Sequence, residues 1–192
     1  MFAYCLNNPS NYIDKDGRDA IWIQEPESAC SFGHSGLVVQ DENGIWYYFF
    51  WGPESEDLDL GLITGTTAAC YVVPLDTEGL DMTNINDVRS AIRQHPETAV
   101  SERADLIGDI EYIEGDFTNS LKYLQNYQRS GKEYNLIYRN CYEVTIRALS
   151  ESDASYAQYM TALPNLGYGT LKIGRQIKSW LKDAREFIRE IF

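Results

Sequence analysis

Residues 33–51, GHSGLVVQDENGIWYYFFW, decide the fold of this 192-residue chain. Two runs of β-branched and aromatic residues, 33–40 and 45–51, flank a four-residue loop, 41–44, that ends in Asn-Gly. Such a loop between two such runs is a strong short-range signal for a β-hairpin. Both runs are apolar on both of their alternating faces, which predicts strands that are covered on both sides. The hairpin is therefore expected to lie in the core, between two other layers.

Further strands and helices are predicted around this hairpin. Residues 68–73 are expected to form a third strand, ended by Pro74. Residues 106–113 are expected to form a fourth, although their charges also allow a loop. Apolar residues at helical spacing predict helices over residues 83–94 and 116–129. The chain is thus expected to fold as a globular domain that mixes strands and helices.

A second informative stretch, residues 134–149, places a cysteine at the start of a helix. Cys141 begins an apolar stripe at helical spacing, which continues with Val144, Ala148 and Leu149. Asn140 fits the N-cap and Glu143 the N3 position, an arrangement that resembles a capping box. A thiol in the first helical turn faces free backbone N–H groups and the positive end of the helix dipole, and both favour the thiolate. Cys141 is therefore the predicted nucleophile, and the same N–H groups are candidates to stabilise an oxyanion.

A cysteine nucleophile needs a base within hydrogen-bond reach, and the chain has two histidines. His34 begins a predicted strand, with small residues around it that leave room for its ring. His95 precedes a proline at a predicted helix end, where an exposed and idle imidazole is expected. We therefore predict His34 as the general base. The rival pair of Cys30 and His95 has the weaker context, because residues 27–33 are not expected to open a helix.

Composition limits the classes of function. The chain has 16 Lys and Arg against 29 Asp and Glu, a net charge of −13, so it would repel a phosphate backbone and no nucleic-acid partner is expected. The four cysteines form no Cys-x-x-Cys pair, so no metal site is expected and no cofactor is implied. The chain has no run of about 18 apolar residues and no basic start before an apolar segment, so we expect neither a membrane span nor a signal peptide.

The first seventeen residues are rich in turn formers and keep no helical or strand period. They resemble the end of the conserved core of RHS-repeat proteins, in the pattern Tyr4-Cys5-x-Asn7-Asn8-Pro9-x-Asn11-x-Ile13-Asp14-x-x-Gly17. The only departure is from the commoner Asp-Pro-x-Gly ending, because Lys15 stands where proline is usual. The resemblance implies that the following residues are the variable toxin domain of a larger secreted or delivered protein. Such a domain would act in or on a target cell, and a cognate immunity protein would neutralise it.

The strand at residues 33–39, followed later in the chain by Asn140-Cys141 at a helix start, resembles the circularly permuted NlpC/P60 and papain-like superfamily. This resemblance implies an α+β fold, in which an antiparallel sheet packs against the cysteine helix. It also implies a Cys/His-dependent hydrolase or acyl-group transferase acting on amide or ester carbonyls. By position, Cys141 becomes the nucleophile and His34 the general base.

The third residue of such a site is left open. The superfamily usually has a polar residue on the strand after the histidine to orient its ring, whereas here only Tyr47 and Tyr48 are available, with Asn140 as a further site-lining candidate. A peptide, a peptidoglycan stem peptide, a protein side-chain amide and a lipid ester all remain candidate substrates. The alternative is a catalytically silent binding module of the same fold, with Cys141 and His34 as ordinary buried residues.

The end of the chain has a different charge from the rest. We divide the chain into the end of an RHS core and linker (1–20), a papain-like domain (21–166) and a C-terminal segment (167–192). From residue 171 onward there are six cations and three anions, and the apolar residues keep helical spacing. An amphipathic C-terminal helix packed on the domain is predicted. Its alternative is contact with a membrane surface, which would make the chain a membrane-active toxin.

Overall fold

The computed structural model describes residues 18–28, 33–53, 68–135 and 139–159. These residues form an α+β fold around a five-stranded sheet in the order β4-β3-β2-β1-β5. Every neighbouring pair of strands is antiparallel. The strands are β1 (Ala20–Glu25), β2 (His34–Gln40), β3 (Trp46–Pro53), β4 (Ala68–Pro74) and β5 (Asp109–Ile113).

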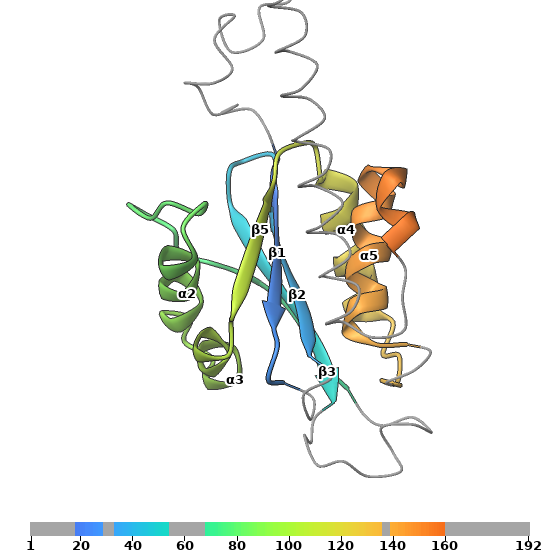
Figure 1. The fold of residues 1–192 in the computed structure, drawn as a ribbon, viewed down its shortest axis with the longest axis horizontal. Helices are drawn as coiled ribbons and strands as arrows, with labels where there is room; N and C mark the ends of the chain where they lie inside the picture. Colours follow the sequence, from blue (N-terminus) through green and yellow to red (C-terminus); the bar gives the residue numbers. More distant parts are fainter. Residues whose placement is uncertain (1–17, 29–32, 54–67, 136–138, 160–192) are drawn as a thin grey trace, which may run out of the picture.

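Helices cover the sheet on both sides, as Figure 1 shows. One side carries α2 (Ile85–Arg93), α3 (Thr98–Ser101) and the short 3₁₀ helix η2 (Glu102–Asp105). The other side carries α4 (Thr118–Arg129), α5 (Cys141–Ser152) and the 3₁₀ helix η3 (Ala154–Tyr159). The prediction of a hairpin buried between two layers is confirmed, since β2 and β3 pair and nearly all their residues are buried.

Two hydrophobic cores lie on the two faces of the sheet, because side chains alternate along each strand. The face toward α4 and α5 buries Trp22, Leu37, Val39, Phe49 and Trp51, among others. The face toward α2 and α3 buries Ile21, Ile23, Val38, Tyr48 and Phe50, among others. Burying one large apolar side chain contributes about 1.5–3 kcal/mol, so each face is a substantial source of stability.

The other predicted elements are confirmed with shifted ends. The helices predicted over 83–94 and 116–129 correspond to α2 and α4, and the strand predicted over 68–73 is β4. The strand predicted from residue 106 begins only at Asp109, because Leu106 follows η2 in a turn. Most of residues 1–20 and the predicted C-terminal helix lie outside the described residues.

Strand β1 was missed by the sequence interpretation, although it is central in the sheet. It pairs with β2 on one side and β5 on the other. Its six residues, AIWIQE, are all buried, and its last two are polar. A short run with a polar end, next to a segment assigned as linker, gave no hairpin or periodicity signal.

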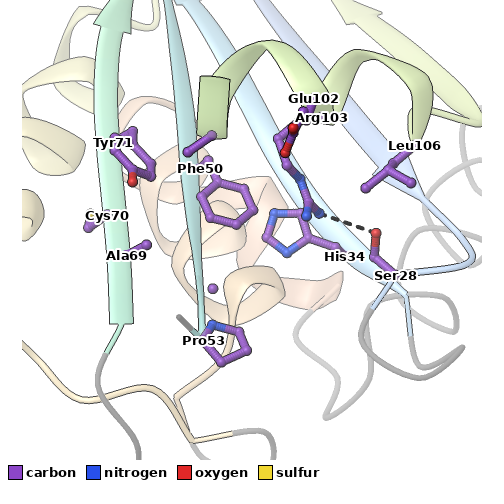
Figure 2. A pocket seen from close by; sticks show the side chains of 12 residues that line it. Ser28, His34, Phe50, Pro53, Ala69, Cys70, Tyr71, Glu102, Arg103 and Leu106 are labelled. Carbon is purple, nitrogen blue, oxygen red and sulfur yellow. Dashed lines mark hydrogen bonds between the residues drawn. The ribbon is translucent and has the colours of Figure 1, made fainter. Parts of the chain in front are cut away.

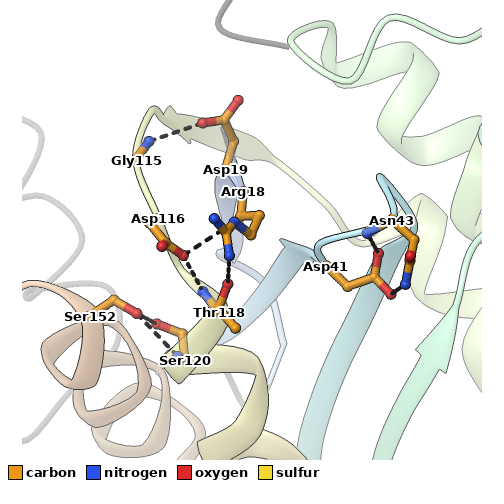
Figure 3. A network of polar contacts seen from close by, with 9 residues as sticks. All are labelled: Arg18, Asp19, Asp41, Asn43, Gly115, Asp116, Thr118, Ser120 and Ser152. Atoms are coloured by element: carbon orange, nitrogen blue, oxygen red, sulfur yellow. Dashed lines mark hydrogen bonds and ion pairs between the residues drawn. The ribbon is translucent and has the colours of Figure 1, made fainter. Parts of the chain in front are cut away.

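Hydrogen bonds and an ion pair connect the residues before β1 to the start of α4, and α4 to α5 (Figure 3). The Arg18 guanidinium lies 3.6 Å from the Asp116 carboxylate and donates to the Thr118 hydroxyl at 3.2 Å. The buried Ser120 hydroxyl donates to the Ala148 carbonyl at 2.6 Å, which ties the two helices together. These contacts position α5, and with it the predicted nucleophile, against the sheet.

Candidate functional site

The predicted helix start at Cys141 is confirmed. Cys141 is the first residue of α5, and the Asn140 side chain accepts a hydrogen bond from the Glu143 N–H at 2.9 Å. This is the N-cap contact that the sequence predicted, and it satisfies one of the free donors of the first turn. Cys141 is a free thiol and is fully buried.

Three donors surround the Cys141 thiol. The Ser35 N–H donates to its sulfur at 3.4 Å, and the Tyr142 backbone also favours the thiolate. The Tyr134 hydroxyl lies beside the thiol and favours its thiolate too, although the contact lacks the geometry of a full hydrogen bond. Burial outweighs these donors and raises the pKa of Cys141 to about 11, with a smaller contribution from the Glu25 charge. The thiol is therefore protonated at neutral pH.

His34 lies at the first position of β2 and is only 3% exposed. Its ring packs on Phe50, with the ring centroids 4.7 Å apart, and its Nε2 has no hydrogen-bond partner among the described residues. Figure 2 shows the ring pointing into a pocket beside the Arg103 guanidinium. Burial lowers the pKa of His34 well below its usual range, and the positive charge of Arg103 lowers it further. The imidazole is therefore neutral.

The structure does not bring Cys141 and His34 into hydrogen-bond contact. His34 packs on Phe50, in the core that faces α2 and α3. Ser35, the next residue, accepts a hydrogen bond from the Trp22 indole in the opposite core, where α5 lies. Neighbouring residues of a strand point to opposite faces, so the thiol contacts the backbone of β2 while the imidazole faces away. The predicted pair is thus not assembled in this arrangement.

The two tyrosines predicted as ring-orienting residues do not contact His34. Tyr48 shares its face of the sheet, but its hydroxyl donates to Glu25 Oε1 at 3.4 Å. Tyr47 is half-buried and packs on the opposite core. Among the described residues, therefore, no polar side chain orients the His34 ring.

A buried ion pair that the sequence interpretation missed lies beside His34. The Arg103 guanidinium donates to Glu25 Oε2, and both side chains are almost fully buried. The Ser28 hydroxyl donates to the same carboxylate at 3.0 Å and accepts from Arg103 at 3.2 Å. Arg103 also lies over the Phe50 ring, 4.5 Å from its centroid. Burial raises the pKa of Glu25, and the charge of Arg103 partly offsets that rise.

No local pattern could have found this pair. Glu25 ends the strand that was not predicted, and Arg103 lies 78 residues later in a short 3₁₀ helix. The cross-strand register places Glu25 directly opposite His34, so the two side chains share one face. The sheet pairing brings Glu25 beside His34, and η2 brings Arg103 onto the same face.

The pocket that His34 faces has a volume of about 760 Å³. It is lined by Ser28, His34, Phe50, Gly52, Pro53, Ala69, Cys70, Tyr71, Ala99, Glu102, Arg103 and Leu106. Cys70 of β4 is also half-buried, but its side chain packs on the core that faces α4 and α5, and burial raises the pKa of its thiol to about 12. It is therefore a poor nucleophile, in agreement with its predicted place in a strand.

The rival pair of Cys30 and His95 is described only in part. Cys30 lies outside the described residues, and His95 follows α2, where its Nδ1 accepts from the Glu97 N–H at 3.3 Å. Within the described part of the chain, no group of three or more His, Cys, Asp or Glu side chains is placed to hold a metal ion. None of the helices described there has the length and apolar character needed to cross a bilayer.

Comparison with known proteins identifies no relative. No protein-family profile, no curated protein and no solved structure matches this chain.

Proposed function

We propose that this chain is a cysteine-dependent hydrolase or acyl-group transferase with Cys141 as the nucleophile. The observation that carries the proposal is the set of donors around the thiol at the start of α5, above all the Ser35 N–H at 3.4 Å. Hydrogen bonds to a thiolate, together with the helix dipole, stabilise the charge that develops when the proton leaves. A thiol whose pKa is about 11 needs a base to remove that proton as it attacks.

His34 is the proposed base. Its ring is neutral, which is the form that accepts a proton, and its own carbonyl carbon is bonded to the Ser35 nitrogen that donates to the thiol. Catalysis then requires the ring to turn from the pocket toward α5. Gly33, immediately before it, has a φ of +85°, a conformation that favours glycine, so this junction is not regular strand.

The reaction would proceed by acyl transfer through a thioester. The Cys141 sulfur attacks the carbonyl carbon while its proton moves to His34. The amine or alcohol then leaves with that proton, and the acyl group stays on sulfur. Water or another acceptor releases the acyl group in a second step. With a net charge of −13, the chain favours neutral or cationic substrates, which include peptides, peptidoglycan stem peptides, glutamine side chains and lipid esters.

We also propose that the chain acts as the effector domain of an RHS-type protein, with a cognate immunity protein as partner. The support is the RHS-like pattern in the first seventeen residues.

A catalytically silent binding module is the second candidate. It is favoured by the opposite orientations of the His34 ring and the Cys141 thiol, and by the raised pKa of that thiol. In this case the thiol is a small core residue and the pocket beside His34 is the functional part of the fold.

Acylation by p-nitrophenyl acetate, followed by peptide mass spectrometry, separates the two candidates. If the hydrolase proposal is right, wild-type protein gains one acetyl group on Cys141, Cys141→Ser gains none, and His34→Ala gains it at least tenfold more slowly. Cys70→Ser, which removes the thiol on β4, should behave as wild type. If Cys141 is not acetylated, or if His34→Ala reacts as fast as wild type, the Cys141–His34 catalytic pair is refuted. The silent binding module is then the better explanation.

A further inference from the structure

The pocket beside His34 lies on the face of the sheet opposite Cys141, so an inference about it goes beyond the proposed function. It is bounded by β2, β3 and β4 and by the segment that carries α3 and η2 (Figure 2). Its volume of about 760 Å³ is in the range of small-molecule sites.

The positive charge of Arg103 in the pocket wall is offset by its ion pair with Glu25. Glu25 and Arg103 neutralise each other, and Ser28 bonds to both of them. An anionic ligand would compete with the Glu25 carboxylate for Arg103, and it would also meet the exposed Glu102 side chain in the pocket wall. A cationic ligand would meet the Arg103 guanidinium. The wall therefore favours an uncharged ligand.

The imidazole of His34 has a polar atom in this wall without a hydrogen bond to the described residues. His34 Nε2 is buried and makes no hydrogen bond to any described residue, whereas the neighbouring Glu25, Arg103 and Ser28 are bonded to one another. Leaving a buried polar atom without a hydrogen bond is unfavourable, and a ligand that bonds to it would recover the lost hydrogen-bond energy. A neutral imidazole has one donor and one acceptor nitrogen, and a hydroxyl group can serve either one.

The rest of the wall is apolar and partly aromatic. Phe50 and Tyr71 face each other with ring centroids 6.1 Å apart. Leu106, also in the wall, is 38% exposed, which is high for a large apolar side chain in this fold. A flat aromatic body would cover these three side chains and gain the usual energy of ring contacts.

We propose that this pocket binds an uncharged aromatic molecule that carries a hydroxyl group, with the ring on Phe50 and Tyr71 and the hydroxyl hydrogen-bonded to His34 Nε2. The unpaired nitrogen, the offset charges and the aromatic wall each point to this class.

The test titrates ¹⁵N-histidine-labelled protein with 4-ethylphenol and follows the ring nitrogens by NMR. The chain has two histidines, so His95, which does not line the pocket, serves as an internal control. We expect saturable shifts of the His34 signals only. Ethylbenzene, which lacks the hydroxyl, and 4-ethylbenzoate, which adds a negative charge, should each bind roughly tenfold more weakly, the loss expected for one hydrogen bond or one unfavourable charge.

A pair of variants on α3 locates the binding. Ala99 is exposed and lines the pocket, so Ala99→Trp should fill part of it and weaken 4-ethylphenol binding at least tenfold. Thr98 is the exposed neighbour and does not line it, so Thr98→Trp should bind as wild type. The proposal is overturned if the His34 signals do not move, if the three probes bind equally well, or if Ala99→Trp binds as tightly as Thr98→Trp. Because no readout involves Cys141, the acylation experiment can fail while this one succeeds, and the reverse.

Discussion

Arg103→Met is expected to destabilise the fold strongly, because it leaves the Glu25 carboxylate buried without its cation. Glu25 is completely buried, and the Arg103 side chain is only 10% exposed. Removing one partner of a buried ion pair costs about 3–5 kcal/mol, whereas the pair itself contributes much less. Methionine keeps the apolar stem that packs near Phe50, so most of the loss comes from the unpaired charge.

The loss of folding stability in Arg103→Met should become smaller as the pH is lowered. Burial already raises the pKa of Glu25 in the folded protein, and removing Arg103 removes the main effect that opposes the rise. A carboxyl with a raised folded pKa loses stability as the pH rises from its unfolded value of about 4.3 through its folded value. Urea unfolding followed by tryptophan fluorescence should therefore show a larger loss for Arg103→Met at pH 7 than at pH 4.5.

Two further variants make the result decisive. Arg93→Met removes an ion pair to Asp105 whose side chains are 53% and 75% exposed, so it should cost less than about 1 kcal/mol at either pH. Adding Glu25→Gln to Arg103→Met removes the buried charge and should restore part of the lost stability. The reasoning is refuted if Arg103→Met and Arg93→Met lose equal free energy of unfolding. It is also refuted if the loss for Arg103→Met does not change with pH.

Three smaller effects are expected elsewhere. Asn140→Ala should lower the free energy of urea unfolding by about 1 kcal/mol, because it removes the N-cap of α5, while Asn140→Asp should retain it; equal losses would contradict the cap. Ser120→Ala should cost about 0.5–1.5 kcal/mol in the same assay, since it removes one hydrogen bond between α4 and α5; a neutral effect would show that the bond contributes nothing. His34 has a lowered pKa in the fold, so wild type should lose stability as the pH falls below about 6.5, and His34→Gln should lessen that fall; parallel pH profiles would contradict it.

The elements predicted correctly are those whose signals are local. The β2–β3 hairpin depends on two apolar runs and the Asn-Gly loop between them. In that loop the Asp41 side chain accepts from the Asn43 N–H (Figure 3) and also from the Ile45 N–H. The start of α5 depends on Asn140 and the residues that immediately follow. In both cases a few neighbouring residues supply the hydrogen bonds and the apolar spacing, so no distant contact has to be known.

Strand β1 and the Glu25–Arg103 pair depend on distant contacts instead. The six residues of β1 become a strand because β2 and β5 pair with them on either side. The carboxylate of Glu25 can be buried at the end of β1 because η2 places the Arg103 guanidinium on the same face of the sheet. Short polar-ended strands and buried charges are decided by tertiary partners, and a single sequence does not reveal those partners.

The relation between His34 and Cys141 was misjudged for a related reason. Strand β2 is buried on both faces, so its apolar pattern does not say which face receives α5. Side chains alternate, and a difference of one residue moves a group to the other side of the sheet. The order of the two motifs along the chain is compatible with the observed contact between the Cys141 thiol and the Ser35 backbone. That order does not indicate to which face of the sheet the His34 ring points. A catalytic pair therefore requires His34 to turn out of its pocket, and the rate at which His34→Ala is acetylated on Cys141 measures whether it does.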